Sequence, residues 1–521
     1  MKSLSPRQLR SLGALVCLLI CATGFAASAR AFGRGDDEIV AEFKKYFRTY
    51  KDAPTRVEAV LSLDGHESAE TVDALVPVLK LQEPDVVRAS VRVLSKFKTQ
   101  PPIQAIFTEI QKNTDEAVRS GLLQAIAEGK YGGATVALTA LLTDKSWEVR
   151  RRAVMALAAT NDTTAAPAIV PLIGDAEPAV RCAALEGLAA MHTQLVVAPA
   201  IKALPDAVWQ VRASAILALK KVRAQESIEP LIARLSAEEG RLQVDVGDAL
   251  NEITGRSFGV RLDLWKQFWD TAKEHFKIPT DAELAALRAK QKEDAAKYKA
   301  AVKETAYHGI ETPSRSILFI IDVSGSMENM VVDKERFQDG GYPSLMRIDI
   351  CKTELQRTIQ SLEDYVDFNI IAFATDVNPW KKQLVRANVL NKSSAGEWVR
   401  RLEAIGGSSK EDLAQAGLTG SANLDKGKTN TYDALMTALN AAGRGTKDKN
   451  YEIAVDTIFF LSDGRPTVGA YVDPDDVLRE VRAANQLRKV VIHTIAIGEF
   501  QKDFMKSLAE QNGGVFVDLG R

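Results

Sequence analysis

A Val-Arg pair returns every 31 residues along the first half of the chain. It occurs at Val87-Arg88, Val118-Arg119, Val149-Arg150, Val180-Arg181 and Val211-Arg212, with a degenerate sixth unit at Leu242-Gln243 and an irregular first unit at Arg56-Val57. A constant period of this length is typical of stacked small units, because each unit buries its apolar face only against its neighbours. The period predicts a helical solenoid over residues 36–280.

Each unit repeats one pattern of small, apolar and charged residues. Small residues three apart follow the arginine and let neighbouring helices approach closely, as at Ala153 and Ala156, Ala184 and Gly187, and Ala215 and Ala218. A second, apolar helix follows, as at Ile228–Leu235. In three units an acid lies six residues before the arginine, at Asp144, Asp175 and Asp206, where we expect it to cap a helix. We expect the arginines to tie one unit to the next.

Paired short helices at this period resemble HEAT-like repeats, particularly the short variety first described in phycobilisome lyases. The resemblance covers about 200 residues and implies an all-α solenoid that offers a binding surface. It does not imply lyase activity, because no residues that could carry that activity are found. Trp265, Phe268 and Trp269 follow helical spacing, and we interpret them as a core that closes the stack rather than a ligand site.

The N-terminus has the order of a secretory signal peptide. Lys2, Arg7 and Arg10 precede an apolar run, and small residues lead to cleavage after Ala29 or Ala31. We therefore expect export to the periplasm, the cell envelope or the medium, with membrane contact only if the signal stays uncleaved as an anchor.

The remaining chain has few cysteines and little net charge. Cys182 and Cys351 fall in different predicted domains, so no disulfide framework is expected. Removing residues 1–29 takes away three basic residues and no acid, so 67 basic and 68 acidic residues become 64 and 68, a net charge of −4. A chain so balanced has no field to hold nucleic acid.

Residues 281–312 are predicted to be a charged helical linker. The stretch Ala282–Ala306 is rich in Ala, Lys and Glu with few large apolar residues, which is typical of a solvated helix that spaces two domains.

Residues 313–521 alternate buried strands with helices. The apolar runs predict strands at Ser316–Val323, Phe368–Ala374, Thr457–Leu461, Val490–Ile497 and Val515–Leu519. The segments between them predict helices at Ile348–Leu362, Tyr432–Ala442, Asp475–Arg488 and Asp503–Gln511. This order predicts an α/β doubly wound, Rossmann-like domain, whose ligands bind beyond the carboxyl ends of the strands.

Oxygen-bearing side chains gather where these strands end. The first strand ends in Asp322, with Ser324 and Ser326 at alternate positions after it, and a later strand ends before Asp463. Thr429 lies in a loop that enters a helix between them. Hard oxygen donors with few charges suit a Mg²⁺-like cation that keeps several waters.

This segment resembles a von Willebrand factor type A domain with a metal-ion-dependent adhesion site. Asp322, Ser324 and Ser326 match the family's Asp-x-Ser-x-Ser, Thr429 its loop threonine, and Asp463 the acid of its Thr-Asp-Gly, here Ser462-Asp463-Gly464. The resemblance implies that these five residues hold a divalent cation, Mg²⁺ first and Mn²⁺ or Ca²⁺ otherwise. It also implies that a protein partner presents an Asp or Glu to the metal.

The segment departs from that pattern in three places. Lys428 stands where the family usually has Gly, so that a long side chain overhangs the site. The connections Glu328–Met346 and Gly406–Gly427 are longer than a minimal domain needs; they either set specificity or are disordered.

The rival chemistries fit less well. A phosphate loop ending at Lys428 would need Gly where Ala422 stands, an aspartyl phosphatase would need a second Asp at Ser324, and the five histidines are scattered. Zinc has no His/Cys cluster, and Arg34-Gly35-Asp36 is interpreted as a chance integrin tripeptide. No catalytic residue is predicted.

The sequence thus predicts an exported, non-enzymatic protein-binding protein with a solenoid surface and a metal-dependent contact. The alternative is an envelope structural or assembly scaffold that acts through the solenoid, with the metal only structural. An accessory to an ATP-driven machine is a third reading. The partner and the oligomeric state are left open.

Overall fold

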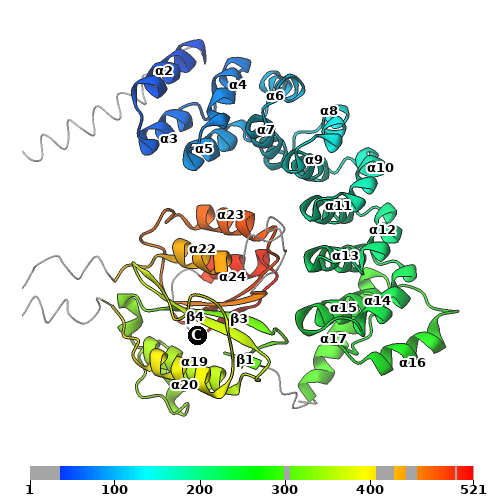
Figure 1. The fold of residues 1–521 in the computed structure, drawn as a ribbon, viewed down its shortest axis with the longest axis vertical. Helices are drawn as coiled ribbons and strands as arrows, with labels where there is room; N and C mark the ends of the chain where they lie inside the picture. Colours follow the sequence, from blue (N-terminus) through cyan, green and yellow to red (C-terminus); the bar gives the residue numbers. More distant parts are fainter. Residues whose placement is uncertain (1–35, 298–304, 406–426, 442–454, 499–501, 520–521) are drawn as a thin grey trace, which may run out of the picture. The chain divides into compact units, whose positions relative to one another are not determined.

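The computed structural model describes residues 36–297, 305–405, 427–441, 455–498 and 502–519 (Figure 1). The predicted signal peptide and nearly all of the connection Gly406–Gly427 lie outside these ranges. The chain divides into two compact units, Met1–Leu172 and Ile173–Arg521, and each is described by itself. Across the described ranges, no helix combines the length and apolar character that a bilayer crossing requires.

The first unit is a stack of short helices in two layers. It contains α2 (Asp36–Thr49), α3 (Ala53–Leu61), α4 (Ala69–Leu75), η1 (Val76–Lys80), α5 (Pro84–Leu94), α6 (Gln100–Lys112), α7 (Glu116–Gly129), α8 (Thr135–Ala140), η2 (Leu141–Thr143), α9 (Trp147–Thr160), η3 (Thr163–Ala165) and α10 (Ala166–Ile169). Helices α3, α5, α7 and α9 pack in one layer, and α4, α6 and α8 in the other. Each inner face is apolar: in α7 the residues Val118, Leu122 and Ile126 are fully buried.

The second unit begins with helices of the same kind. They are α11 (Pro178–Ala190), α12 (Val197–Ala203), α13 (Trp209–Val222), α14 (Ile228–Leu235), α15 (Gly240–Thr254), α16 (Leu262–Ala272) and α17 (Asp281–Lys297), and η4 (Val170–Gly174) spans the boundary between the units. Helix α13 packs between α11 and α15. Trp265 of α16 is fully buried with its ring edge-on to Phe258 and Phe268, which confirms a packing role for this aromatic group.

Three of the repeat arginines form ion pairs with an acid of the following repeat, as predicted. Arg181 donates from Nε and Nη2 to the two carboxylate oxygens of Asp206, 25 residues later, both at 3.0 Å. Arg119 pairs with Asp144 through Nη1, because its Nε donates to the Asn113 carbonyl, and Arg212 pairs with Glu238. These three arginines therefore bind one repeat to the next.

The prediction that the repeat acids cap helices is wrong. Helix α9 is capped by Ser146, and α11 and α13 begin after Glu177 and Val208 with no side-chain cap. The acids lie two residues earlier: Asp144 and Asp206 accept the N–H of Ser146 and Val208, both at 2.8 Å. A carboxylate in this turn satisfies the backbone on one side and meets an arginine on the other.

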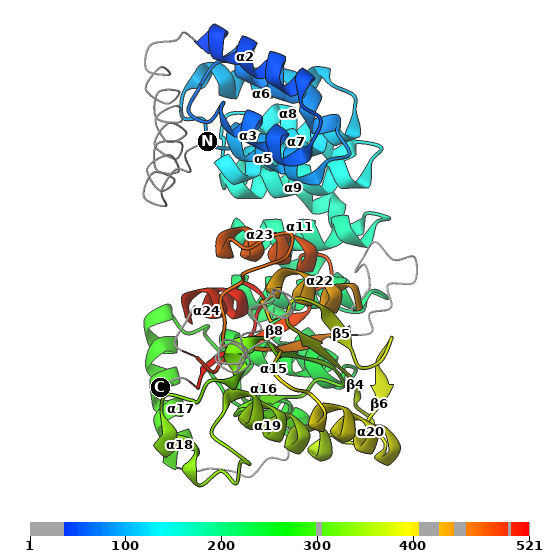
Figure 2. The ribbon, with the colours of Figure 1, turned by 90° about the vertical axis from the view of Figure 1, so that its left-hand side faces the viewer.

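The second unit also holds a seven-stranded sheet with helices on both faces (Figure 2). Its order is β5 (Val377–Pro379), β4 (Asp367–Phe373), β3 (Ser316–Asp322), β7 (Thr457–Ser462), β8 (Val491–Ala496) and β9 (Phe516–Asp518), with β6 (Val385–Arg386) also paired to β4. The strands β4, β3, β7, β8 and β9 are parallel, whereas β5 and β6 run antiparallel to β4. The sheet confirms the predicted doubly wound domain.

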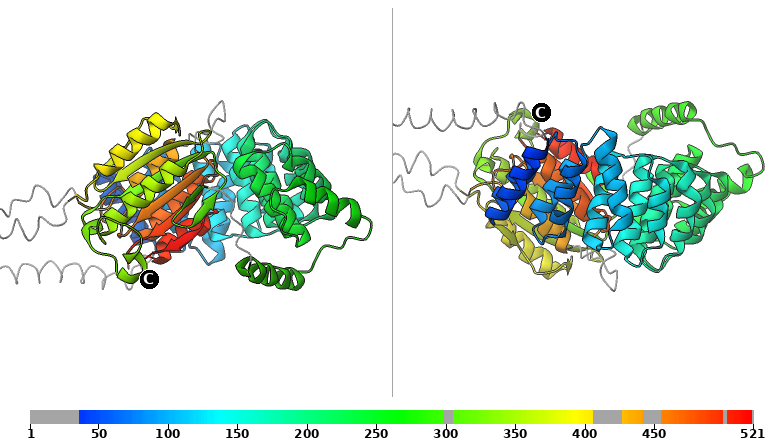
Figure 3. Two further views of the ribbon diagram at one scale, coloured as in Figure 1. Left: turned by 90° about the horizontal axis from the view of Figure 1, so that it is seen from below. Right: turned by 90° about the horizontal axis from the view of Figure 1, so that it is seen from above.

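The two faces of the sheet bury different helices (Figure 3). One face packs against α19 (Arg347–Ser361) and α20 (Val389–Arg400), and the other against α22 (Thr431–Ala441), α23 (Pro474–Asn485) and α24 (Lys502–Gln511). Along β3, Phe319 and Ile321 face the first group and Leu318 and Ile320 the second. This alternation explains why the strand reads as one continuous apolar run.

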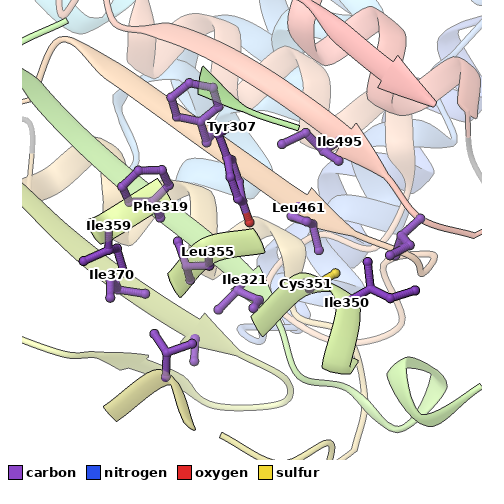
Figure 4. Packing of buried hydrophobic residues seen from close by; sticks show 14 of the residues in the cluster. Tyr307, Phe319, Ile321, Ile350, Cys351, Leu355, Ile359, Ile370, Leu461 and Ile495 are labelled. Atoms are coloured by element: carbon purple, nitrogen blue, oxygen red, sulfur yellow. The ribbon is translucent and has the colours of Figure 1, made fainter. Parts of the chain in front are cut away.

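The predicted charged linker is helical in its first part, α17 (Asp281–Lys297), but this helix is not a solvated spacer: Leu284 is 3% exposed, and Gln291 Nε2 donates to the Gly255 carbonyl at 2.9 Å. Farther along, β1 (Thr305–Tyr307) and β2 (Ile310–Thr312) form an antiparallel pair. The Tyr307 ring is buried edge-on against Phe319 and Phe459, so this segment is part of the core (Figure 4). Burial of the large Tyr307 ring stabilises this pair of strands more than the local amino-acid composition favours a helix.

Both cysteines of the described chain are free and buried. Cys351 lies in the same cluster as Tyr307 and Ile321, as expected of a packing residue (Figure 4).

Candidate metal site

The candidate site lies where the sheet reverses its winding order. Strands β3 and β7 are neighbours, yet the chain leaves β3 toward α19 and β4 on one side, and leaves β7 toward α23 and β8 on the other. Such a switch point opens a crevice at the carboxyl ends of the two strands. Asp322 is the last residue of β3, and Asp463 follows directly after β7.

The turn after β3 is fixed by backbone hydrogen bonds. The Val323 N–H donates to the Phe373 carbonyl at 2.8 Å, and the Ile405 N–H donates to the Val323 carbonyl at 2.8 Å. The Ser324 N–H donates to Asp322 Oδ1 at 2.8 Å, and the chain then enters the turn η7 (Gly325–Glu328). The Asp322 carboxylate is thereby held in place by its own strand end.

A connected row of oxygens joins the two strand ends. Ser324 Oγ and Ser326 Oγ are 3.2 Å apart, and Ser326 Oγ donates to Asp463 Oδ1 at 2.7 Å. Ser462, which replaces the threonine of the family pattern, donates its hydroxyl to Asp322 Oδ2. Four of the five predicted ligands therefore lie within one hydrogen-bonded row.

Thr429 reaches the same point from a third loop. Its N–H donates to Thr467 Oγ1 at 2.9 Å, and the Gly325 N–H donates to the carbonyl of Gly427 at 3.1 Å, which ties this loop to both others. A Cβ placed on Gly464 would lie 3.1 Å from Thr429 Oγ1 and 3.6 Å from Ser326 Oγ. The structure thus gathers all five residues, and a glycine at position 464 leaves room between the hydroxyls.

The electrostatics of the site favour a cation. Asp322 is fully buried, and burial raises the pKa of its carboxyl to about 7, with the negative charge of Asp463 adding to the rise. A carboxylate deprived of water beside a second carboxylate is stabilised by a nearby positive ion. Two carboxylates and three hydroxyls are a donor set that a Mg²⁺-like ion accepts, so the residues fit the predicted metal.

The site is poor in charged ligands. No group of three or more His, Cys, Asp or Glu side chains forms a metal cluster anywhere in the described ranges. A metal here would rely on hydroxyls and water, which favours a hard cation over zinc.

An arginine that sequence reasoning missed completes the site. Arg347, the first residue of α19, donates from Nη1 to Asp463 Oδ2 at 2.6 Å, and its side chain is 9% exposed. It lies 116 residues from Asp463, and no local pattern announces the pair. One turn later is Cys351, whose thiol pKa is raised well above its usual value by burial first and then by Asp463 and Asp322.

The two long connections have different outcomes. Residues Glu328–Met346 fold back on themselves: the Val331 N–H donates to the Leu345 carbonyl at 3.0 Å, and Val331 and Phe337 are buried. A short helix, α18 (Lys334–Gln338), lies within this connection. Gly406–Gly427 lies outside the described residues except for Gly427, and the side chain of Lys428 beside it is exposed.

Three family models match the chain. Residues 134–207 match HEAT repeats, 211–237 the PBS lyase HEAT-like repeat, and 341–518 the von Willebrand factor type A domain. The chain therefore combines HEAT-like repeats with a von Willebrand factor type A domain, which confirms the predicted fold class. The third match includes Thr429 and Asp463 but begins after Asp322, Ser324 and Ser326.

Two curated relatives each match 40% of the chain. Inter-alpha-trypsin inhibitor heavy chain H4 of Homo sapiens is 26% identical over 212 residues, 40% of this chain and 19% of that protein. Heavy chain H3 of Mus musculus is 26% identical over 213 residues, 40% of this chain and 20% of that protein. The chain thus spans about a fifth of the length of the curated relatives it matches.

Two solved structures each match about two fifths of the chain. A von Willebrand factor type A protein from Catenulispora acidiphila covers 40% of this chain and 39% of its own, at 19% identity and a TM-score of 0.27. The phycocyanin lyase complex of CpcE and CpcF from Nostoc covers 42% of this chain and 94% of its own, at 17% identity and a TM-score of 0.25.

Proposed function

We propose that this chain is a non-enzymatic binding protein whose type A domain holds a divalent cation and, through it, an acidic group of a protein partner. Asp322, Ser324, Ser326, Thr429 and Asp463 hold the ion, Mg²⁺ in the first place. The convergence of these five side chains at the carboxyl edge of the sheet carries the proposal. The match to a domain that commonly serves protein interactions supports it.

The donor set explains why an external carboxylate is wanted. A hard cation bound by only two carboxylates and neutral hydroxyls keeps coordination positions for water, and an Asp or Glu of a partner is a stronger ligand than the water it replaces. Ser324 and Asp322 are too buried to take a partner's side chain themselves, which leaves the cation as the point of contact.

We also propose export after removal of residues 1–29, with the HEAT-like helices as a second interaction surface. The order of charged, apolar and small residues at the N-terminus supports export. The repeat helices support a binding surface because stacked repeats serve mostly in that way. In the alternative, the repeats alone hold the partner and the metal only stabilises the domain.

Partner capture from an envelope extract tests the proposal. The full mature chain is used as bait with Mg²⁺, with excess chelator, and as the variant Asp322→Asn. Asp367→Asn is the matched control, because Asp367 begins β4 at the opposite edge of the sheet and is partly exposed. Capture that requires Mg²⁺ and Asp322 but not Asp367 supports the adhesion role. Capture that persists in chelator contradicts it and favours the alternative.

A further inference from the structure

The candidate site contains a buried positive charge of its own. Arg347 donates from Nη1 to Asp463 Oδ2 at 2.6 Å, and the side chains of the pair are 9% and 0% exposed. The other oxygen of Asp463 accepts from Ser326. The guanidinium is therefore on the far side of Asp463 from the hydroxyl row and does not take the place of a ligand.

The position of Arg347 is set by the fold around it. Its N–H donates to the Asn329 carbonyl at 2.9 Å, so the base of the Glu328–Met346 connection fixes the start of α19. A Cβ placed on Gly498 would lie 3.3 Å from Arg347 Nη1 and 2.8 Å from the Asp463 carbonyl oxygen. Gly498, just after β8, thus leaves room for the Arg347 guanidinium and for the backbone carbonyl and Cβ of Asp463.

Arg347 uses only part of its hydrogen-bonding capacity. Its Nε is buried and makes no hydrogen bond to any part of the chain that the structure describes. A guanidinium stays cationic in proteins and offers five donors, of which the carboxylate of Asp463 here engages Nη1.

The sum of charges changes what the loaded site requires. Asp322 and Asp463 with a divalent cation alone would be neutral. With Arg347 the same group carries one net positive charge in a buried setting, where uncompensated charge is costly. An incoming carboxylate removes that charge.

We propose that Arg347 is a positioning residue that makes metal binding and carboxylate binding mutually dependent: the ion binds tightly only when an acidic group binds with it. This inference rests on the proposed metal site and deepens it. It assigns the dependence to a residue outside the ligand set. Coupling between two bound species is reciprocal, so a carboxylate must tighten the metal by the factor by which the metal tightens the carboxylate.

The test measures the affinity of the full chain for Mn²⁺ from the electron paramagnetic resonance signal of the free ion. The affinity is measured in acetate, in neutral acetamide and in chloride, at equal ionic strength. Acetate is expected to tighten Mn²⁺ binding to the unchanged protein about tenfold, within the usual range for coupled sites. Acetamide is expected to have no effect. The readout is the ratio of the Mn²⁺ affinity in acetate to that in chloride. If Arg347 only oriented Asp463, its replacement would change both affinities by the same factor and leave this ratio unchanged.

Three variants separate charge from orientation. Arg347→Lys keeps the charge and should keep the acetate effect. Arg347→Gln removes the charge and should bring the ratio close to one. Arg347→Gln combined with Asp463→Asn removes both charges of the buried ion pair, so neither partner is left without the other, and this variant should fold even if the single variant does not. Its loaded site has the same net charge as the unchanged protein, so the acetate effect should persist although Mn²⁺ binds more weakly.

The outcomes distinguish this inference from the proposed function. No Mn²⁺ binding under any condition contradicts the metal site itself. Mn²⁺ binding without an acetate effect overturns the inference and leaves the metal site standing. An acetate effect that survives unchanged in Arg347→Gln, or that is lost from the double variant, also overturns it.

Discussion

The repeats and the sheet domain both bury charged side chains, and they balance that charge differently. In the repeats, shielded acids such as Asp206 and Asp144 meet an arginine of the preceding repeat, Arg181 and Arg119 respectively. In the sheet domain Arg347 pairs with Asp463 alone, whereas Asp322, among the residues that the structure describes, has only the Ser324 N–H and the Ser462 hydroxyl as partners. An ion pair with equal and opposite charges links two helices, whereas a site with more buried negative than positive charge is stabilised by binding a cation.

The balanced pairs should be costly to break. Arg181→Met leaves the Asp206 carboxylate without its partner in a place only 16% exposed, and we expect a loss of about 3 kcal/mol in local stability. Hydrogen exchange of the amides of α11 and α13 measures this loss. Lys221→Met, at an exposed position of α13, is the control and should change little. Equal effects of the two variants would contradict a structural role for the ladder.

His493 is a third case, because this buried side chain has no ionic partner in the described part of the chain and its burial disfavours the charged form. Burial lowers the pKa of His493 to about 4, and its Nδ1 accepts the Val515 N–H at 3.0 Å. As the pH falls from 6.5 toward 4 the unfolded chain takes up a proton that the folded chain does not. We therefore expect a loss of about 3 kcal/mol over this window.

Calorimetric scans at several pH values check this expectation. His493→Gln should flatten the dependence between about pH 7 and pH 4, whereas the exposed His275→Gln should leave it unchanged. A slope that His493→Gln does not alter would refute the assignment.

Crowding the unbalanced site should weaken it without removing any charge. In Gly498→Ala the new methyl group would meet the Asp463 carbonyl oxygen at 2.8 Å, so backbone must shift, at a cost of about 2 kcal/mol. The control Gly396→Ala lies within α20, where the nearest atom would be 3.8 Å away. It should raise stability by about 0.5–1 kcal/mol. Thermal unfolding compares the two, and a neutral Gly498→Ala would show that the site tolerates displacement.

Removing the negative charge of Asp322 should change the stability of the metal-free protein very little. Asp322→Asn keeps an acceptor for the Ser324 N–H and removes a buried carboxylate whose charged form is disfavoured. We expect the metal-free unfolding temperature to stay the same or rise, with the free energy of unfolding within about 1 kcal/mol of the original. A large loss would mean that Asp322 is a structural residue like those of the ladder.

The sequence predicts most of the fold because both parts carry strong patterns. The 31-residue period and the apolar strand runs come from burial that repeats along the chain, and the structure places β3, β4, β7 and β8 within a residue or two of the predicted bounds. Short edge strands such as β5 and β6 escape prediction, since they pack on one side only and their few residues form no periodic pattern.

The candidate site is predictable where it follows strand ends and hidden where it depends on distant packing. Asp322, Ser324 and Ser326 stand in one local motif, and the parallel sheet brings Asp463 to the same edge. Arg347 and Gly498 have no such signal, because their roles arise only when α19 and the end of β8 close around Asp463. The pairing of the repeat acids Asp144 and Asp206 is hidden for a similar reason, because their arginine partners lie 25 residues away.

The most direct test of the central claim is the binding of Mn²⁺ to the full chain, measured by calorimetry with the unchanged protein, Asp322→Asn and the control Asp367→Asn. The account predicts one ion per chain for the unchanged protein and for Asp367→Asn, and a loss of at least about 100-fold in affinity for Asp322→Asn. Equal binding by all three proteins, or no binding by the unchanged protein, would contradict it.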